Sequence, residues 1–249
     1  MRTTMLKYLQ STFKTFPFFI FFILSGPAHA SVVLDGTRVI YPEEKNEVSI
    51  RMTNEGGEPK LVQVWIDDGD KKASPENIRV PFVVTTPIFR IDPKKGQIAK
   101  IQYTRSLPVP SDRESVYWLN VLEIPGKPTV KEDDANYLQF RFRTRVKIFL
   151  RPKGLEGIAN DAPGKLIVKY QPGKVMLENP TPYHVNISTL GVGSNADGGV
   201  VEAEMISPYT TKTFDLKRVR SSQKSPSVKY KSVNDYGGSP VWEKPTATF

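Results

Sequence analysis

Between residues 137 and 152 the chain reads Tyr137-Leu138-Gln139-Phe140-Arg141-Phe142-Arg143-Thr144-Arg145-Val146-Lys147-Ile148-Phe149-Leu150-Arg151-Pro152. Successive side chains of a strand point to opposite faces, so Leu138, Phe140 and Phe142 share one face, and the other face carries Gln139, Arg141, Arg143 and Arg145. The predicted strand, 138–150, is much longer than a mean strand of about 5–6 residues. The alternation alone favours a core-facing strand with a solvated back, but the length favours a strand that extends past its own sheet.

Shorter alternating runs of Val, Ile, Phe and Tyr recur along the chain, separated by Pro, Gly and Asn. Helical periodicity is almost absent, so the pattern is typical of an all-β sandwich. The first half of the chain predicts enough strands for one immunoglobulin-like domain. These strands are 32–41, 47–53, 61–66, 80–85, 98–103, 115–123 and 138–150.

The predicted boundary between two domains is Arg151-Pro152-Lys153-Gly154, because proline cannot continue a ladder and Pro-x-Gly forms a turn. Strands with weaker alternation follow at 165–170, 174–178, 184–190, 199–205, 211–216, 227–232 and around 240–242. The chain is therefore predicted to be all-β, with immunoglobulin-like β-sandwich domains over 31–152 and 153–249. Two sandwiches joined by a tight turn leave a cleft, and binding sites tend to lie in such clefts.

Residues 1–30 have the layout of a cleaved secretory signal peptide. The positive start contains no acidic residue, and the apolar run 16–24 is too short to span a bilayer. Ala28-His29-Ala30 provides a small-x-small cleavage site. We predict export, with no membrane insertion of the mature chain; an uncleaved anchor is the alternative.

The composition excludes several kinds of site. The chain has no cysteine, which rules out disulfides, thiol nucleophiles and cysteine-based metal sites. His184 is the one histidine beyond the signal peptide, and we interpret it as a surface residue of a strand. Because no nucleophile motif accompanies it, we predict no enzyme activity, no cofactor and no metal. An exported chain rarely meets nucleic acid, so the net charge of +9 is interpreted as a mixed basic surface, without a nucleic-acid partner.

Five separated motifs carry a resemblance to a known family. They are Leu34-Asp35-Gly36-Thr37-Arg38-Val39-Ile40-Tyr41, the group Arg113-Glu114-Ser115 with Leu119-Asn120 and Glu123-Ile124-Pro125, Val146-Lys147-Ile148-Phe149-Leu150-Arg151-Pro152, Glu178-Asn179-Pro180-Thr181-Pro182-Tyr183, and Asn234-Asp235-Tyr236-Gly237-Gly238. In this order they resemble the periplasmic pilus chaperones, the PapD-like family, over essentially the whole mature chain. The resemblance implies two immunoglobulin-like domains in an L or boomerang shape with a cleft between them. Several members carry a disulfide in the second domain, which this chain lacks.

The resemblance also implies the residues that bind a pilus subunit. Arg38 and Lys147 would lie in the cleft and bind the subunit's C-terminal carboxylate, each with a charge-assisted hydrogen bond of roughly 1.5–3 kcal/mol. Leu138, Phe140 and Phe142 would fill the groove of a subunit that lacks its final strand, at about 1.5–3 kcal/mol each before ordering costs. Lys147 has the opposite parity to these three, and a bulge or strong twist is one way to reconcile them.

Glu114, Arg151 and Asp235 match the positions of an ion network between the two domains of the family. We interpret them as holding the sandwiches at a fixed angle. The implied partners are pilus subunits and an outer-membrane usher, and the implied compartment is the periplasm. An exposed apolar strand is an aggregation hazard, so a self-capping homo-oligomer is a further hypothesis for the free chain.

The main alternative is an exported structural or adhesive subunit of immunoglobulin-like fold. Such a subunit needs one incomplete domain with a donor segment ahead of it, whereas two domains are predicted here. A carbohydrate-binding module would gather exposed aromatic side chains on one face. Trp65, Trp118 and Trp242 fall in three separate predicted strands, and we interpret each as a core residue.

Overall fold

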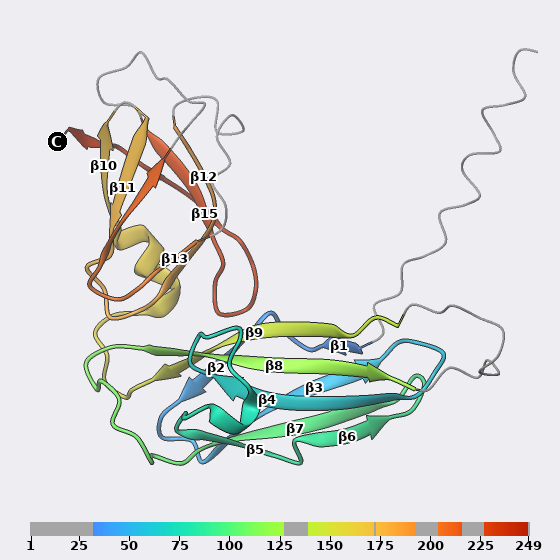
Figure 1. Ribbon diagram of the computed structural model, residues 1–249. Coiled ribbons are helices and arrows are strands. Elements are labelled where there is room, and N and C mark those ends of the chain that lie inside the picture. The colour runs from blue at the N-terminus through green and yellow to red at the C-terminus, as the bar shows by residue number, and fades with distance from the viewer. Residues whose placement is uncertain (1–31, 127–138, 172, 193–203, 216–226, 249) are drawn as a thin grey trace, which may run out of the picture.

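The computed structural model describes residues 32–126, 139–171, 173–192, 204–215 and 227–248 (Figure 1). The predicted signal peptide and the predicted donor residue Leu138 lie outside these ranges. The described chain is mostly strand, with short 3-10 helices at Pro75–Asn77 (η2) and Ala159–Lys165 (η3). None of the helices in the described ranges is long and apolar enough to cross a membrane.

The first sandwich consists of two packed sheets built from residues 32–151. One sheet has the strand order β1-β3-β7-β5 and the other has the order β2-β9-β8-β4-β6. The strands are β1 (Val32–Leu34), β2 (Arg38–Pro42), β3 (Glu47–Asn54), β4 (Lys60–Asp67), β5 (Phe82–Thr85), β6 (Ile88–Ile91), β7 (Gly96–Tyr103), β8 (Ser115–Pro125) and β9 (Phe142–Arg151). The pairing of β2 with β9 is parallel, and the two strands therefore run in the same direction.

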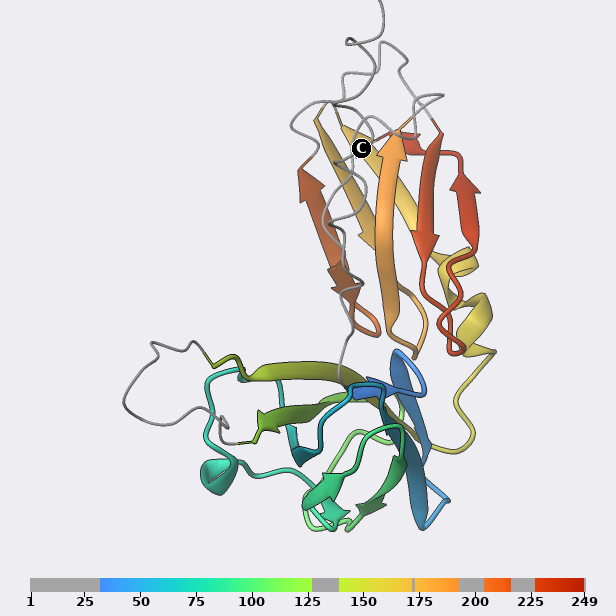
Figure 2. The ribbon, with the colours of Figure 1, turned by 90° about the vertical axis from the view of Figure 1, so that its right-hand side faces the viewer.

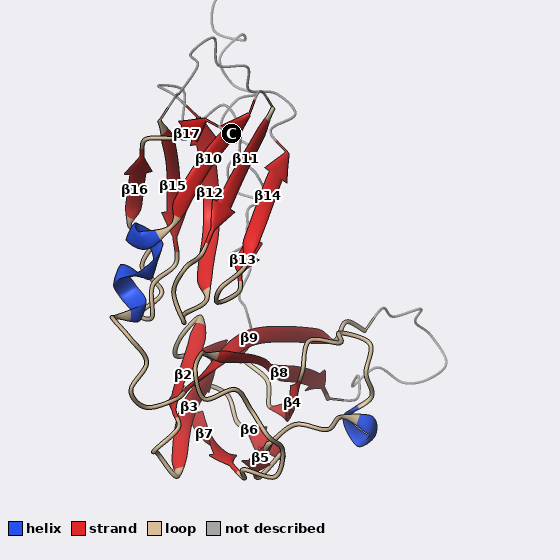
Figure 3. Cartoon of the chain, turned by 90° about the vertical axis from the view of Figure 1, so that its left-hand side faces the viewer, coloured by secondary structure: helices blue, strands red, loops and turns tan. Residues whose placement is uncertain are grey.

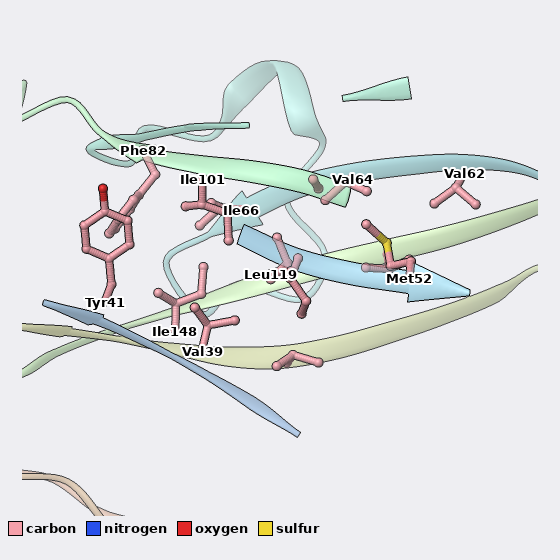
Figure 4. Close-up of a cluster of buried hydrophobic side chains, with 14 of the residues drawn as sticks. Val39, Tyr41, Met52, Val62, Val64, Ile66, Phe82, Ile101, Leu119 and Ile148 are labelled. Carbon is pink, nitrogen blue, oxygen red and sulfur yellow. The ribbon is translucent and has the colours of Figure 1, made fainter. Parts of the chain in front are cut away.

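Alternate residues of both sheets point inward and form one apolar core (Figure 4). The fully buried ring of Tyr41 packs edge-on against Phe82, with the ring centroids 5.4 Å apart. Its hydroxyl accepts a hydrogen bond from the backbone N–H of Tyr103 at 2.9 Å and lies 2.9 Å from the carbonyl of Asn46, to which it donates. A buried hydroxyl that is hydrogen-bonded in this way fixes β2, the strand that begins with Arg38.

The predicted strand 32–41 is two strands in two different sheets. β1 pairs with β3, and β2 pairs with β9. Gly36 lies between them with φ +138°, where a Cβ would lie 3.4 Å from the carbonyl oxygen of Arg38. Glycine reaches this backbone conformation far more readily than other residues, so the chain can cross from one sheet to the other here. The flanking alternation conceals the break, which only Asp35-Gly36 signals.

Two further strand predictions need correction. β6 (Ile88–Ile91) was not predicted; it is a four-residue strand that follows the turn at Thr86, whose φ is 59°, and it pairs at the sheet edge with β4. β9 begins at Phe142 rather than at Leu138, and residues 139–141 are not in a strand. The ladder with β8 ends at the pair Glu123–Phe142, so the alternation continues beyond the hydrogen bonding that defines a strand.

The second sandwich consists of the sheets β14-β11-β10-β17 and β13-β12-β15-β16, which enclose a second apolar core. Its strands are β10 (Ile167–Gln171), β11 (Lys174–Glu178), β12 (Val185–Val192), β13 (Glu204–Ile206), β14 (Thr211–Asp215), β15 (Val228–Ser232), β16 (Val241–Lys244) and β17 (Ala247–Thr248). The strand β17 and the helix η3 were not predicted. Residues 199–203 of the predicted strand 199–205 lie outside the described ranges.

The two sandwiches meet end to side and form an L (Figures 1 and 2). The second sandwich stands over the end of the first where β2 lies and where β9 finishes, and η3 lies beside the connection (Figure 3). The predicted two-domain, all-β architecture is therefore confirmed. This arrangement places the start of β2 and the end of β9 against the lower loops of the second sandwich.

Candidate binding site between the two domains

Arg38 and Lys147 are direct neighbours across the parallel pair β2–β9, where they are register partners. Paired strands lie about 4.8 Å apart, so the two side chains leave the sheet together on the same face. The adjacent residues Val39, Val146 and Ile148 point into the core, so this face is the outer one. Residues more than a hundred positions apart in sequence thus form a pair of cations at the junction of the domains.

Each of the two cations donates a hydrogen bond to the second sandwich. Nη1 of Arg38 donates to the carbonyl of Val233 at 2.9 Å, and Nζ of Lys147 donates to Oδ1 of Asn186 at 2.8 Å. The guanidinium also lies over the ring of Phe149, 5.8 Å from its centroid. The cation pair is therefore half-buried in the contact between the domains and also lines the cleft.

The electrostatics of this pair favour an anion. Burial lowers the pKa of the Lys147 ammonium, and the positive charge of Arg38 lowers it further. Burial also lowers the pKa of Arg38, although the carboxylates of Asp235 and Glu114 partly oppose this. Among the described residues, neither cation forms an ion pair with an acidic side chain, and the buried Nε of Arg38 has no hydrogen-bond partner. A carboxylate bound here would stabilise both positive charges.

Glu114, Arg151 and Asp235, predicted as an ion network, are in contact. Nε of Arg151 lies 2.7 Å from Oε1 of Glu114, and its two terminal nitrogens lie 2.9 and 3.1 Å from the two carboxylate oxygens of Asp235. Asp235 belongs to the second sandwich, so this two-pronged ion pair joins the domains. The backbone adds to it, because the N–H of Glu114 donates to the carbonyl of Pro182 at 2.9 Å.

His184 was predicted to be a surface residue, and this is wrong. Its side chain is only 4% exposed, and its ring packs against Phe149 with the centroids 5.5 Å apart. Its backbone N–H donates to Oε2 of Glu114 at 2.8 Å, and Nδ1 lies 3.4 Å from the same oxygen. Burial alone raises the pKa of Glu114, but these contacts and the charge of Arg151 outweigh it and keep the pKa below its usual value.

Phe140 and Phe142, two of the predicted donor residues, are exposed. Each side chain is 63% exposed, and the rings stack on each other with centroids 6.4 Å apart. Leu138, the third predicted donor, lies outside the described residues. Two exposed phenylalanines side by side are unusual for a solvated surface and indicate a binding surface.

The parity of Lys147 needs no bulge. The register of β9 is unbroken against both β8 and β2, so Phe142 lies on the core-facing side of the strand and Lys147 on the outer side. The strand has two halves. Beyond Val146 its inward side chains fill the core, and before Val146 the same face reaches past the core.

One edge of β9 is open beside the exposed phenylalanines. On one side β8 pairs with β9 from Phe142 to Leu150, but on the other side β2 pairs only with residues 147–151. Within the described chain, residues 142–146 therefore have no strand partner on the β2 side. The crossing at Gly36 causes this, because it sends β1 to the other sheet instead of along β9. An open edge of this kind is a template for a further strand.

Trp65 and Trp118 are not core residues, contrary to the sequence interpretation. Both lie on the outer face of the β9 sheet, where the guanidiniums of Arg143 and Arg145 cover their rings at 4.8 and 5.2 Å from the centroids. Trp242 packs on the core of the second sandwich as predicted, although it is only partly buried. In the register of β4 against β8, Trp65 lies opposite Asn120 and Trp118 opposite Asp67, on the outer face, and the separate strand patterns did not reveal this.

In the described ranges no group of three His, Asp or Glu side chains is placed to hold a metal ion. The features found are instead a cation pair at the junction and, along β9 away from it, an open strand edge and exposed aromatic rings. Together with the L-shaped pair of sandwiches, they define a two-domain immunoglobulin-like protein whose site suits an extended chain.

The chain belongs to the PapD family of pilus-assembly chaperones. Residues 31–156 match the family described as "Pili and flagellar-assembly chaperone, PapD N-terminal domain". Residues 161–243 match "Pili assembly chaperone PapD, C-terminal domain". These matches confirm the family predicted from the five motifs.

Relatives and solved structures agree with this family. The chain is 41% identical over 221 residues to the probable fimbrial chaperone YadV of Escherichia coli. The alignment covers 86% of this chain and 89% of YadV. It is 43% identical over 219 residues to the chaperone protein FimB/FhaD of Bordetella pertussis, covering 86% and 88%. The YadV crystal structure aligns with a TM-score of 0.74 and 36% identity over 87% of this chain and 100% of that chain. A chain from the complex of Salmonella enterica SafA pilin with the SafB chaperone aligns with a TM-score of 0.73 and 25% identity. This alignment covers 88% of this chain and 98% of that chain.

Proposed function

We propose that this chain is a periplasmic chaperone that binds pilus subunits by donating strand β9 and binding their C-terminal carboxylate. Arg38 and Lys147 bind the carboxylate, and Phe140 and Phe142, together with Leu138, enter the groove of the subunit. The observation that carries the proposal is that an open strand edge ends at a cation pair. Phe142 and Lys147 are separated by about 17 Å at roughly 3.3 Å per residue, so one extended segment reaches both.

The geometry also supports one direction for the bound strand. A strand that occupies the open edge beside residues 142–146 lies in line with β2, which occupies the rest of the same edge. Its C-terminus must meet Arg38, the first residue of β2, if the carboxylate reaches the cations. The bound strand therefore runs parallel to β9, as β2 does, and β2 limits how far it can advance.

The contributions to binding are of two kinds. Backbone hydrogen bonds and the burial of the two rings would hold any subunit whose groove fits them. Each buried ring contributes about 1.5–3 kcal/mol before ordering costs. The cation pair selects a chain end, because only a terminus places a carboxylate in line with the strand. Subunits that share nothing else still share this group.

The remaining parts of the proposal rest on the sequence and the family. The signal-like residues 1–30 support export to the periplasm and cleavage before Ser31, and the mature chain would then divide into domains at 31–152 and 153–249. An outer-membrane usher would receive the loaded subunit, and a second copy of the chain would cover the phenylalanines of the free form. The role is binding rather than catalysis, with no cofactor or metal.

Affinity co-purification from periplasm tests the proposal. The tagged chain is expressed with the pilus subunits of its own operon, as wild type, as Lys147→Ala and as Lys153→Ala, a control at an exposed lysine. We expect subunits to co-purify with wild type and with the control. With Lys147→Ala, the amount of co-purified subunit should fall by roughly tenfold or more. The fold is expected to tolerate this change, because it removes one of two adjacent half-buried cations. Recovery of subunits by Lys147→Ala at the wild-type level would refute carboxylate anchoring.

A further inference from the structure

Asn186, near the start of β12, is the residue of the second sandwich that contacts Lys147. It is buried, with 6% of its surface exposed, and its Oδ1 accepts the hydrogen bond from Nζ at 2.8 Å. An ammonium has three donors and no acceptor, so the amide must turn its oxygen toward Lys147. The Nδ2 group with its two donors is then not used by the lysine, and it forms no hydrogen bond to the described residues.

The backbone around Asn186 is held in place from the same side. Its carbonyl accepts a hydrogen bond from the N–H of Val233 at 2.8 Å, and the carbonyl of Val233 accepts from Nη1 of Arg38 at 2.9 Å. Two hydrogen-bonded residues of the second sandwich thus contact the two cations of the first, one each. The amide is fixed relative to both cations rather than to Lys147 alone.

We infer that Asn186 is the second-domain member of the carboxylate anchor, an inference that rests on the proposed function. Oδ1 positions Nζ of Lys147, and Nδ2 donates a hydrogen bond to the bound carboxylate. Lys147 keeps two further N–H donors when one is used by Asn186, so the ligand does not have to displace the amide. Donors from both sandwiches then surround a group that has only acceptors.

This arrangement makes Asn186 a determinant of specificity for a free chain end. A terminal carboxylate accepts from Lys147, Arg38 and Nδ2 without any unpaired donor of its own. A terminal amide carries an NH₂ group, and this group meets only donors at the same place. Loss of Asn186 should therefore weaken the binding of acid-terminated chains more than that of amide-terminated chains.

The test uses the full mature chain and synthetic peptides with the C-terminal sequences of its operon's subunits. The peptides have about ten residues, enough to span about 33 Å of strand, and each is made as a free acid and as an amide. Calorimetry gives the ratio of the two affinities for wild type, Asn186→Asp, Asn186→Ala and Ser188→Ala. The last variant is a control on the same strand, where the hydroxyl hydrogen-bonds only the carbonyl of Lys231, at 3.3 Å.

We expect wild type and Ser188→Ala to prefer the free acid by roughly tenfold or more. Asn186→Asp should remove that preference, because its carboxylate occupies Lys147 and repels the ligand, and Asn186→Ala should reduce it several-fold. A purely structural role would weaken both peptides equally. If wild type prefers the acid and both variants keep the preference, this inference is overturned and the proposed function stands. If wild type shows no preference, carboxylate anchoring itself fails. Thermal unfolding confirms that each variant is folded, and either variant alone suffices for the comparison.

Discussion

Asp67 is fully buried on the outer face of the first sandwich, where no apolar core surrounds it. Its carboxylate accepts hydrogen bonds from Nδ2 of Asn120 at 2.7 Å and from the backbone of Gly69 at 2.8 Å, and it forms ion pairs with Arg143 and Arg145. These two arginines cover the tryptophan rings and come from the half of β9 beside the open edge. One carboxylate therefore links β4, β8 and the proposed donor strand β9 on the outer face of their sheet.

We expect Asp67→Asn to lower the free energy of unfolding by about 1–3 kcal/mol, because two partly buried guanidiniums lose their anion. Asp68→Asn is the matched control, since Asp68 is the exposed neighbour on the same chain segment. Urea unfolding of the purified chains measures the difference. Equal stability of the two variants would show that the carboxylate contributes nothing beyond what an amide supplies.

At the scale of single residues, the sequence was informative where a motif named the residue. Arg38 and Lys147 were predicted from short motifs, and the structure places them side by side. Asn186 and His184 were missed because their roles depend on which residues of the first sandwich they meet, and a single strand pattern carries no such information. A polar residue at the start of a strand that follows Asn-Pro-Thr-Pro was the only available signal for them.

At the scale of elements, β9 combines a structural half and a binding half on one regular strand. Ile148 is completely buried in the core, whereas Phe142, on the same face, is 63% exposed. The difference arises from where the neighbouring strands end, since the face and the parity are identical. Alternation alone predicted the faces of the strand correctly, but it placed the start of the strand too early and could not locate the point at which the core ends.

Substitutions on this one face should therefore separate binding from stability. Phe142→Ala is expected to change the free energy of unfolding by no more than about 0.5 kcal/mol, as for other exposed sites, and to weaken subunit binding by roughly tenfold or more. Ile148→Ala should instead lower stability by about 2–5 kcal/mol through a cavity in the core. Denaturant unfolding and co-purification measure the two properties. A large loss of stability in Phe142→Ala would mean that this ring belongs to the fold.

The break between β1 and β2 was hidden for a related reason. The residues before and after Gly36 alternate as one strand would, yet they pair with different sheets. Which sheet each half joins depends on long-range pairing, and local propensity does not encode it. The open edge of β9 follows directly from that choice, so the feature most important for binding was the least visible in the local sequence.

At the scale of the whole molecule, the contact between the domains is largely polar and charged. Arg151 joins Glu114 to Asp235, and His184 covers the same carboxylate from the second sandwich. A buried charged group of this kind contributes more to a defined orientation than to net stability. We therefore expect the cleft that holds Arg38 and Lys147 to keep its width only while this contact is intact.

Acid should therefore loosen the angle between the domains. The pKa of Glu114 lies below its usual value of 4.5 in the folded chain, so the stability it contributes is fully present above that value. It is lost as the pH falls through the lower folded-state pKa, when Arg151 and the backbone of His184 lose their anionic partner. Glu114→Gln should lower stability at neutral pH by about 1–3 kcal/mol and make its loss below about pH 4.5 shallower.

Small-angle scattering and thermal unfolding of wild type, Glu114→Gln and the exposed control Glu156→Gln, between neutral and acid pH, measure these effects. Wild type and the control should keep a constant radius of gyration until the pH falls below the usual range of a carboxyl. Glu114→Gln should show a wider distribution of interdomain angles already at neutral pH. Because the cation pair and Asn186 come from different domains, subunit binding should fall together with the loss of a fixed angle. If Glu114→Gln keeps the wild-type scattering curve at neutral pH, the angle is set by the backbone contact of Glu114 with Pro182 and not by the ion network.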